Sequence, residues 1–195
     1  MKKYLEWIVV ILISCILYFT IHSFFIQNYT VSGESMSPTF HNNDKVLVTP
    51  ITKKLHLLKN GDVIVFHAHK DIDYIKRLIG KPGDTIEYKN DNLYINNIKV
   101  AEPYLDENKK RKVGIYLTEN FDVSILKGSN NQYKIPDKKY LVLGDNRQNS
   151  IDSRSVIGLI DENTIVGSVF LRYQPFNDFN YSFYPESFTR ISSLS

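Results

Sequence analysis

The clearest folding signal in the chain reads Asn60-Gly61-Asp62-Val63-Ile64-Val65-Phe66. An Asn-Gly-Asp turn leads directly into four apolar residues, and such a run favours a strand. Polar residues 67–73 connect it to a second apolar run at 74–79, which ends at the turn Gly80-Lys81-Pro82-Gly83-Asp84. These residues predict two strands separated by a polar connection.

The flanking sequence continues this pattern of short strands and turns, with little helical periodicity. Residues 103–138 are more polar and weakly patterned, so we interpret about 85–138 as an insertion or cap between two halves of a core. The prediction is a mostly β domain. Further strands are expected at 46–48, 85–88, 93–95, 98–100, 140–143 and 165–173.

The N-terminal segment has a different character. Residues 7–26 contain no Asp, Glu, Lys or Arg, and about 20 such residues suffice for a helix that crosses the ~30 Å hydrocarbon layer. Lys2 and Lys3 precede the segment, and no Lys or Arg follows it until Lys45. The positive-inside rule then predicts a cytoplasmic N-terminus at 1–6, a single transmembrane signal anchor at 7–26 and an extracytoplasmic domain at 27–195, held at the cell membrane.

A cleaved secretory signal peptide is the alternative interpretation of this segment. Signal peptides have apolar cores of about 7–15 residues followed by small residues at the cut. Here the apolar run is longer and continues into Phe25-Ile26-Gln27-Asn28-Tyr29. An uncleaved membrane helix is favoured.

Composition excludes several other classes of protein. A net charge of +3, with basic residues interleaved among acidic ones, is too slight to indicate a nucleic-acid partner. Cys15 is the single cysteine, so an intramolecular disulfide is impossible.

Three polar segments stand out from this background. The first is Ser32-Gly33-Glu34-Ser35-Met36-Ser37-Pro38-Thr39, which taken alone is an ordinary serine-rich turn. The second places Lys76 and Arg77 within the apolar strand at 74–79. A buried lysine loses hydration, its pKa falls, and near neutral pH it can accept a proton. The alternative is an edge strand from which the lysine extends into water.

The third segment, Gly144 to Arg154, packs two aspartates, two arginines and two serines into a loop that leaves a strand. An ion pair between Asp152 and Arg154 would make that loop rigid. A rigid loop can hold a hydroxyl such as that of Ser150 against another side chain.

In this order the three segments resemble those of the type I signal peptidases, in their short Gram-positive form. The family's nucleophile box stands at 32–39, its lysine box at 76–84 and its Gly-Asp-Asn-Arg box at 144–154, with a fourth match at 61–66. The resemblance covers about residues 5–175. It implies a β-rich protease core with a smaller cap, and a membrane-bound serine endopeptidase that removes signal peptides from exported preproteins.

The same resemblance implies a role for each position. Ser35 takes the place of the nucleophile and Lys76 that of the general base; Ser150 would orient the lysine, and Asp152 and Arg154 would support the loop. Gly33 departs from the family, because some relatives have there a serine that contributes to the oxyanion hole. The composition of that hole is left open.

By resemblance the substrate has small residues at the first and third positions before the cut and lies extended in a strand-like cleft. The expected partners are secretory preproteins and the lipid bilayer, with no metal, cofactor or nucleic acid. The sequence gives no oligomeric state. Candidate residues for lining the cleft are Val31, Ser32, Met36, Tyr74 and Ile75.

Three other functions compete with this interpretation. His67 and His69 suggest a histidine or metal hydrolase, but no Glu, Cys or His at ligand spacing accompanies them. A catalytically silent, membrane-tethered binding relative is disfavoured because Ser35, Lys76 and Ser150 are all present. The self-cleaving repressor proteases share the serine–lysine chemistry but give no reason for a membrane segment.

The C-terminal part is rich in aromatic residues without clear periodicity. Strand packing and a frayed tail are the simplest interpretation, and we also hypothesise that some rings dip into the lipid interface. These residues are Tyr173, Phe176, Phe179, Tyr181, Phe183, Tyr184 and Phe188.

Overall fold

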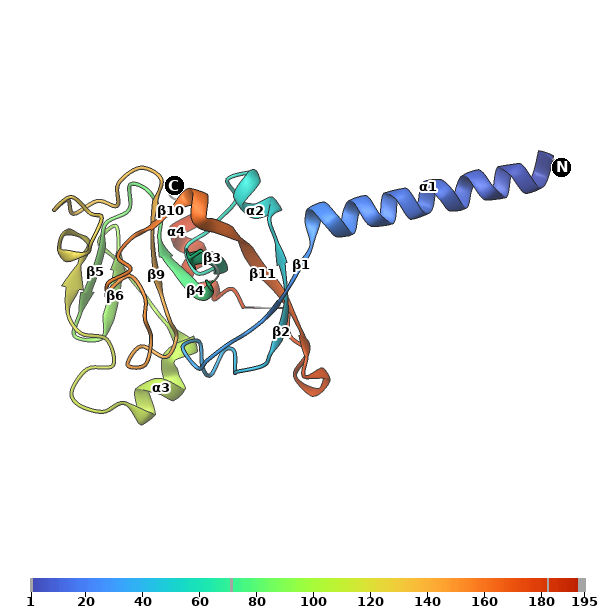
Figure 1. Cartoon of the computed structure of the whole chain (residues 1–195). Coiled ribbons are helices and arrows are strands. Elements are labelled where there is room, and N and C mark those ends of the chain that lie inside the picture. Colours follow the sequence, from blue (N-terminus) through green and yellow to red (C-terminus); the bar gives the residue numbers. More distant parts are fainter. Residues whose placement is uncertain (1, 71, 182, 193–195) are drawn as a thin grey trace.

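The computed structural model describes residues 2–70, 72–181 and 183–192 and is mostly β, as predicted (Figure 1). Two antiparallel sheets carry the fold, one of seven strands and one of four. Figure 1 shows the smaller sheet, with β5 and β6, at the end of the domain away from helix α1 (Lys2–Phe25).

The seven-stranded sheet has the order β1-β2-β11-β3-β4-β9-β10. Strands β3 (Val63–His69) and β4 (Ile72–Gly80) are the two runs expected from the central sequence, and they pair with each other. Because β4 also pairs with β9 on its other edge, it is an interior strand. The remaining strands are β1 (Gln27–Thr30), β2 (Lys45–Thr49), β9 (Lys139–Leu143), β10 (Ile160–Asp161) and β11 (Ile165–Gln174).

The four-stranded sheet has the order β7-β6-β5-β8 and lies within the segment expected to be a cap. Its turns are short because paired polar residues adopt positive φ: Asn96 and Asn97, between the partners Ile95 and Ile98, have φ values of 51° and 64°. Such values suit a tight hairpin turn. The strands are β5 (Ile86–Lys89), β6 (Asn92–Ile95), β7 (Ile98–Val100) and β8 (Phe121–Asp122).

The hydrophobic core forms three clusters, and the largest joins the two sheets. Ile86, Leu93 and Ile95 of the smaller sheet pack in one cluster with Leu141 and Leu143 of β9. At roughly 25 cal/mol per Å² of apolar surface removed from water, this shared core stabilises the smaller sheet against the larger one.

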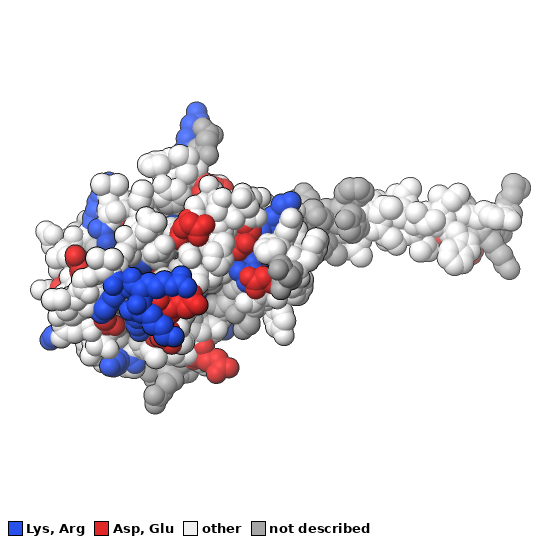
Figure 2. All heavy atoms as spheres, turned by 90° about the horizontal axis from the view of Figure 1, so that it is seen from below, with Lys and Arg blue, Asp and Glu red and all other residues white. Residues whose placement is uncertain are grey.

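Short helices occupy the connections. Helix α3 (Asp106–Arg111) was not predicted, because its polar sequence has no apolar stripe. Figure 2 views the face from which α3 projects and shows Lys and Arg atoms beside a smaller acidic group, consistent with a helix whose first turn is acidic and last turn basic. The other elements are α2 (Ile51–Lys54), α4 (Thr189–Ser192), η1 (Pro103–Leu105), η2 (Val123–Ile125), η3 (Glu162–Thr164), η4 (Phe176–Asp178) and η5 (Glu186–Phe188).

Helix α1 projects from the domain at the start of β1 (Figure 1). Its described apolar side chains, among them Trp7, Ile8 and Leu17, are exposed. The side chains of residues 18–24, within the predicted membrane segment, lie outside the described set. A search of the described residues finds no helix that is both long enough and apolar enough to cross a membrane.

The aromatic C-terminal part divides into buried and exposed rings. Phe176 is 82% exposed, and Phe179 and Tyr181 are also exposed. The hypothesis of lipid contact is wrong for Phe183 and Phe188, because both rings are buried and Phe183 packs on Phe40 with ring centroids 4.6 Å apart.

Candidate active site

Ser35 lies in the loop between β1 and β2. The loop is compact because Met36, which follows Ser35, is fully buried. The Met36 carbonyl also accepts a hydrogen bond from the Phe40 N–H. The Val31 N–H donates to the Asp44 carbonyl at 2.8 Å and closes the base of the loop. A small side chain is thereby held at a fixed position between two strands.

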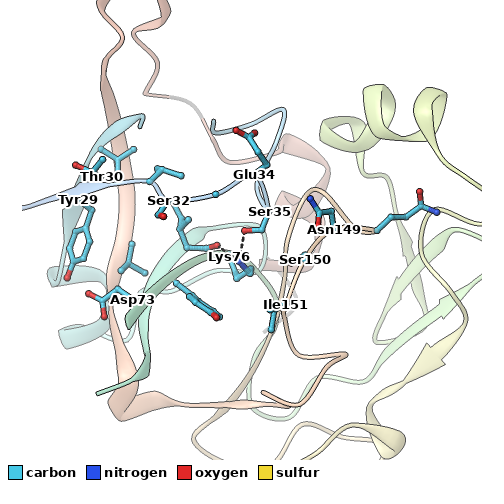
Figure 3. Close-up of a pocket in the computed structure, with 17 residues that line it drawn as sticks. Tyr29, Thr30, Ser32, Glu34, Ser35, Asp73, Lys76, Asn149, Ser150 and Ile151 are labelled. Carbon is cyan, nitrogen blue, oxygen red and sulfur yellow. Dashed lines mark hydrogen bonds between the residues drawn. The ribbon is translucent and has the colours of Figure 1, made fainter. Parts of the chain in front are cut away.

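Lys76 enters the site from the interior strand β4. Its Nζ donates a hydrogen bond to Ser35 Oγ at 2.6 Å and another to the Ile75 carbonyl at 3.0 Å (Figure 3). The lysine is only 3% exposed, and its Nζ lies 5.1 Å from the centre of the Tyr74 ring. The alternative of an edge strand with a solvated lysine is therefore wrong.

The electrostatics of this lysine match the prediction of a proton acceptor. Burial lowers the pKa of Lys76 to about 8, against the opposing attraction of Asp152 and Asp145. The charged form is disfavoured because the ammonium group has lost most of its hydration. A substantial fraction of the amine is then neutral near physiological pH and can take a proton from the Ser35 hydroxyl.

A buried ion pair beside the lysine fixes the strand to the catalytic loop. The Arg77 guanidinium donates to both carboxylate oxygens of Asp145, at 2.9 and 2.7 Å, and Thr39 Oγ1 donates to the same carboxylate at 2.5 Å. The Asp145 charge keeps the pKa of Arg77 above its ordinary value although burial lowers it. This pair was not predicted from the sequence. The available signal was an arginine in one motif and an aspartate in another, whose opposite charges could pair.

The predicted pair of Asp152 and Arg154 is confirmed. Arg154 donates to both oxygens of the carboxylate at 2.9 and 2.8 Å, and the Gly144 N–H donates to it at 3.0 Å. Burial by itself raises the pKa of Asp152, but these donors outweigh it, so that pKa lies below its ordinary value. These hydrogen bonds tie the two ends of the loop together.

Ser150 lies beside Ser35 and Lys76 in the cleft, but its role is not visible as a hydrogen bond (Figure 3). Its Oγ is buried and meets no group of the described residues at normal hydrogen-bonding geometry, although it lies near enough to the Asp152 carboxylate to help lower the pKa of that group. A Cβ added to Gly144 would lie 2.5 Å from the Ser35 carbonyl oxygen and would overlap the Ser150 side chain. Glycine at position 144 therefore allows the two loops to meet at the nucleophile.

The loops are also joined by Asn146. Its backbone N–H donates to the Ser35 carbonyl and its side chain to the Glu34 carbonyl, both at 3.0 Å. Asn108 of α3 adds hydrogen bonds to the Ser37 and Asp145 carbonyls, both at 2.8 Å. Neither residue was predicted, because amide contacts to backbone leave no pattern in the sequence.

The dyad opens into a cleft of about 510 Å³. Of the predicted cleft residues, Val31, Ser32, Tyr74 and Ile75 line it. The prediction for Met36 is wrong, because its side chain is fully buried in the core that includes Val31 and Ile75. The far end of the cleft, beside Tyr29, carries Asp73 (Figure 3).

The backbone conformation at position 33 suits the glycine that stands there in place of the serine of some relatives. Gly33 has φ of 85°, which a residue with a side chain rarely adopts, and its N–H donates to Asn42 Oδ1 at 2.9 Å. The Ser35 N–H, by contrast, makes no hydrogen bond to any residue that the structure describes. One backbone donor at the nucleophile is therefore free.

The competing histidine site lacks the groups it needs. His67 Nδ1 lies 2.5 Å from an oxygen of Asp73 on the exposed part of the β3–β4 pair. No cluster of three or more His, Cys, Asp or Glu able to hold a metal occurs among the described residues.

Comparison with known proteins decides the family. The sequence profile described as "Signal peptidase, peptidase S26" matches residues 4–174. The chain belongs to this signal peptidase family. It is similar to signal peptidase IB of Staphylococcus aureus, with 49% identity over 187 residues that cover 95% of this chain and 97% of the relative.

Two further S26 relatives agree. Signal peptidase I T of Bacillus subtilis is 44% identical over 180 residues, covering 91% of this chain and 89% of the relative. A crystal structure of a signal peptidase I from Enterococcus faecalis is 34% identical and superposes with a TM-score of 0.52, covering 57% of this chain and 95% of that one. The structural neighbour and the sequence relatives therefore point to the same peptidase family.

Proposed function

We propose that this S26 peptidase removes signal peptides from exported preproteins with Ser35 as nucleophile and Lys76 as general base. The observation that carries the proposal is the 2.6 Å contact between Lys76 Nζ and Ser35 Oγ, made by a lysine that is almost fully buried. A nucleophile and a base within hydrogen-bonding distance form the minimal unit of covalent acyl transfer.

Catalysis proceeds in two halves. Neutral Lys76 takes the Ser35 proton as Oγ attacks the scissile carbonyl, and the resulting ammonium then protonates the leaving amine. The ester left on Ser35 is hydrolysed by a water that Lys76 activates in turn. The half-buried Tyr74 and the buried Ile75 beside it favour the neutral lysine at the start of each half.

The oxyanion that forms during both halves needs hydrogen-bond donors. The unpaired Ser35 N–H is positioned at the nucleophile itself and supplies one of them. Gly33 adds no hydroxyl, and its own N–H is already bonded to Asn42. A second donor is therefore a group that takes up its position only when substrate is bound.

The substrate lies extended along the cleft with its pre-cut residues against Val31, Ser32, Tyr74 and Ile75. Val31 and Ser32 follow β1, and Tyr74 and Ile75 belong to the part of β4 that pairs with β3 but lies before the β9 pairing, which begins at Arg77. The unpaired side of this part of β4 suits pairing with a strand-like peptide. The resemblance to the family implies small side chains at the first and third positions before the cut.

The membrane arrangement is a further part of the proposal. Residues 7–26 form a single transmembrane signal anchor, residues 1–6 are cytoplasmic, and residues 27–195 form the extracytoplasmic catalytic domain with 85–138 as its cap. The absence of charge from 7–26, the lysines at positions 2 and 3 and the exposed apolar side chains of α1 support it. In intact protoplasts, added protease should digest residues 27–195; protection of the whole domain would refute the topology.

The catalytic proposal is tested by incubating the full chain, purified in detergent, with a secretory preprotein and mapping the cut by mass spectrometry. Cleavage after a small-x-small sequence by wild type and no cleavage by Ser35→Ala are expected. Cleavage that survives in Ser35→Ala would remove this serine from the mechanism. His67→Ala, with metal chelator present, should cleave like wild type and so separates this proposal from the histidine alternative.

A further inference from the structure

The hollow surface at the active site does not end at the catalytic loop. Gln148 lines both the 510 Å³ cleft of Ser35 and a second cavity of about 670 Å³ beneath residues 113–117. The two hollows therefore adjoin at Gln148, and the second one is lined by a loop of the cap segment.

That loop is apolar and open to solvent. Val113 is 82% and Ile115 is 78% exposed, and Tyr116 and Ile125 beside the same cavity are exposed as well. Exposed apolar side chains that gather beside a cavity mark an interaction site more often than isolated ones do.

Side-chain hydrogen bonds from Gln148 and Asp91 hold the backbone of this loop and of the residues that follow it. The Gln148 side chain accepts from the Val113 N–H at 3.0 Å and donates to the Val113 carbonyl at 2.7 Å and the Tyr116 carbonyl at 3.3 Å. The Asp91 carboxylate accepts from the Leu117 and Thr118 N–H groups at 3.1 and 2.7 Å. Pre-ordered apolar side chains lose little conformational entropy when a ligand binds.

The direction of the substrate indicates the occupant. Under the proposed function, on which this inference rests, the residues before the cut lie against Val31, Ser32 and Tyr74. The chain after the cut must leave Ser35 on the other side, where Gln148, Asn149 and Ile151 line the cleft. An extended polypeptide that follows the hollow surface then meets residues 113–116.

We propose that the loop 113–116, fastened to the catalytic loop by Gln148, binds the part of the substrate that follows the cut and favours apolar side chains there. The loop acts as a specificity determinant for the mature end of the preprotein. It binds the leaving segment before acyl transfer, and this segment departs with the new amine.

The test compares two peptides that share the same residues before the cut. The short peptide ends one residue after the cut, and the long peptide continues for eight residues with apolar side chains. The double variant V113S/I115S of the full chain should lose about tenfold more kcat/KM on the long peptide than on the short one, because it removes apolar contacts that only the long peptide makes. The matched control, Leu55→Ser, changes an exposed apolar residue outside both cavities and should leave the ratio as in wild type.

The outcomes separate this inference from the proposed function. An equal loss on both peptides, or no loss on either, would overturn the inference while leaving the dyad intact. Failure of wild type to cleave either peptide would instead contradict the proposed function. Binding is read independently with Ser35→Ala and a long peptide that carries a photoreactive phenylalanine after the cut: cross-links to residues 113–116 support the site, and cross-links confined elsewhere overturn it.

Discussion

At the scale of single residues, the proposed mechanism makes Lys76 the group that sets the pH dependence of the reaction. Its pKa of about 8 means that the neutral, reactive fraction grows as pH rises through that value. Turnover of wild type should therefore rise with an apparent pKa near 8 rather than near the ~10.4 of a free lysine. Lys76→Arg, which stays charged, should be as inactive as Lys76→Ala. A pH–rate profile for each variant checks this, and substantial activity in the arginine variant would contradict the dyad.

The same pKa predicts a stability effect. The folded pKa lies below the unfolded one, so the unfolded chain binds more protons between about pH 8 and 10.4, and stability rises with pH across this window. Below the window the buried charge costs roughly 3 kcal/mol, the equivalent of the shift from 10.5 to about 8. Lys76→Met should then be no less stable than wild type at pH 7.

Ser150 offers a second test at this scale. Its buried Oγ makes no well-formed hydrogen bond in the resting site and is only the last of the groups that lower the pKa of Asp152, so Ser150→Ala should lower stability by less than about 1 kcal/mol. We expect turnover to fall about 10- to 100-fold, because the hydroxyl can accept a hydrogen bond from Lys76 when the lysine becomes charged. Acylation of Ser35 should remain detectable by mass spectrometry.

Ser153→Ala is the matched control for this variant. Its hydroxyl accepts from the Val142 N–H at 2.9 Å. It should therefore lose about 1 kcal/mol of stability with little change in turnover of the folded protein. Full turnover in Ser150→Ala would remove this residue from the mechanism.

At the scale of elements, the smaller sheet is connected to the catalytic loop through Arg147. Its buried guanidinium bonds Glu102 at 2.6 Å, the Tyr88 hydroxyl at 2.8 Å and the Gly144 carbonyl at 3.0 Å. Arg147→Met should cost about 3 kcal/mol, because it leaves the buried Glu102 charge without its cationic partner and with only the Tyr88 and Tyr104 hydroxyls as donors. Thermal unfolding and turnover should both fall.

The double variant R147M/E102L distinguishes ion pairing from packing. It removes both charges, so most of the stability lost in Arg147→Met should return. If the two single losses simply add in the double variant, the pair is not coupled. The turnover need not return with stability, since the bond to the Gly144 carbonyl is still missing.

The strands could be predicted from the sequence, but several contacts that position the site residues could not. Strands such as β3 and β9 were predicted because apolar runs between turn residues leave a direct pattern. Helix α3 was missed because its contacts are made by Asn108 to backbone carbonyls, which no periodicity encodes. Met36 was misplaced for a related reason: an apolar residue next to a nucleophile has the same sequence signature whether it faces substrate or core.

At the scale of the whole molecule, the distance between the helix and the nucleophile is limited by chain length. Ser35 follows Gln27, the first residue of β1, by eight positions. At 3.3–3.6 Å per residue the two can be at most about 29 Å apart. If α1 lies in the bilayer as proposed, the dyad stays within about 29 Å of Gln27 and so near the membrane surface. This position suits a preprotein that is cut close to the bilayer.

This confinement predicts that the connection, not only the dyad, sets the rate on natural substrates. An insertion of 20 alanine-rich helical residues between Ile26 and Gln27 would add about 30 Å between membrane and dyad. Processing of a preprotein inserted in liposomes should fall about tenfold or more, while cleavage of a soluble peptide in detergent should stay as in wild type, because the catalytic loops are untouched. A flexible Gly/Ser insertion of equal length serves as the control, since it lets the domain return to the surface and should restore part of the lost rate. Equal processing of the inserted preprotein by all three proteins would show that the short connection at 26–27 does not position the active site.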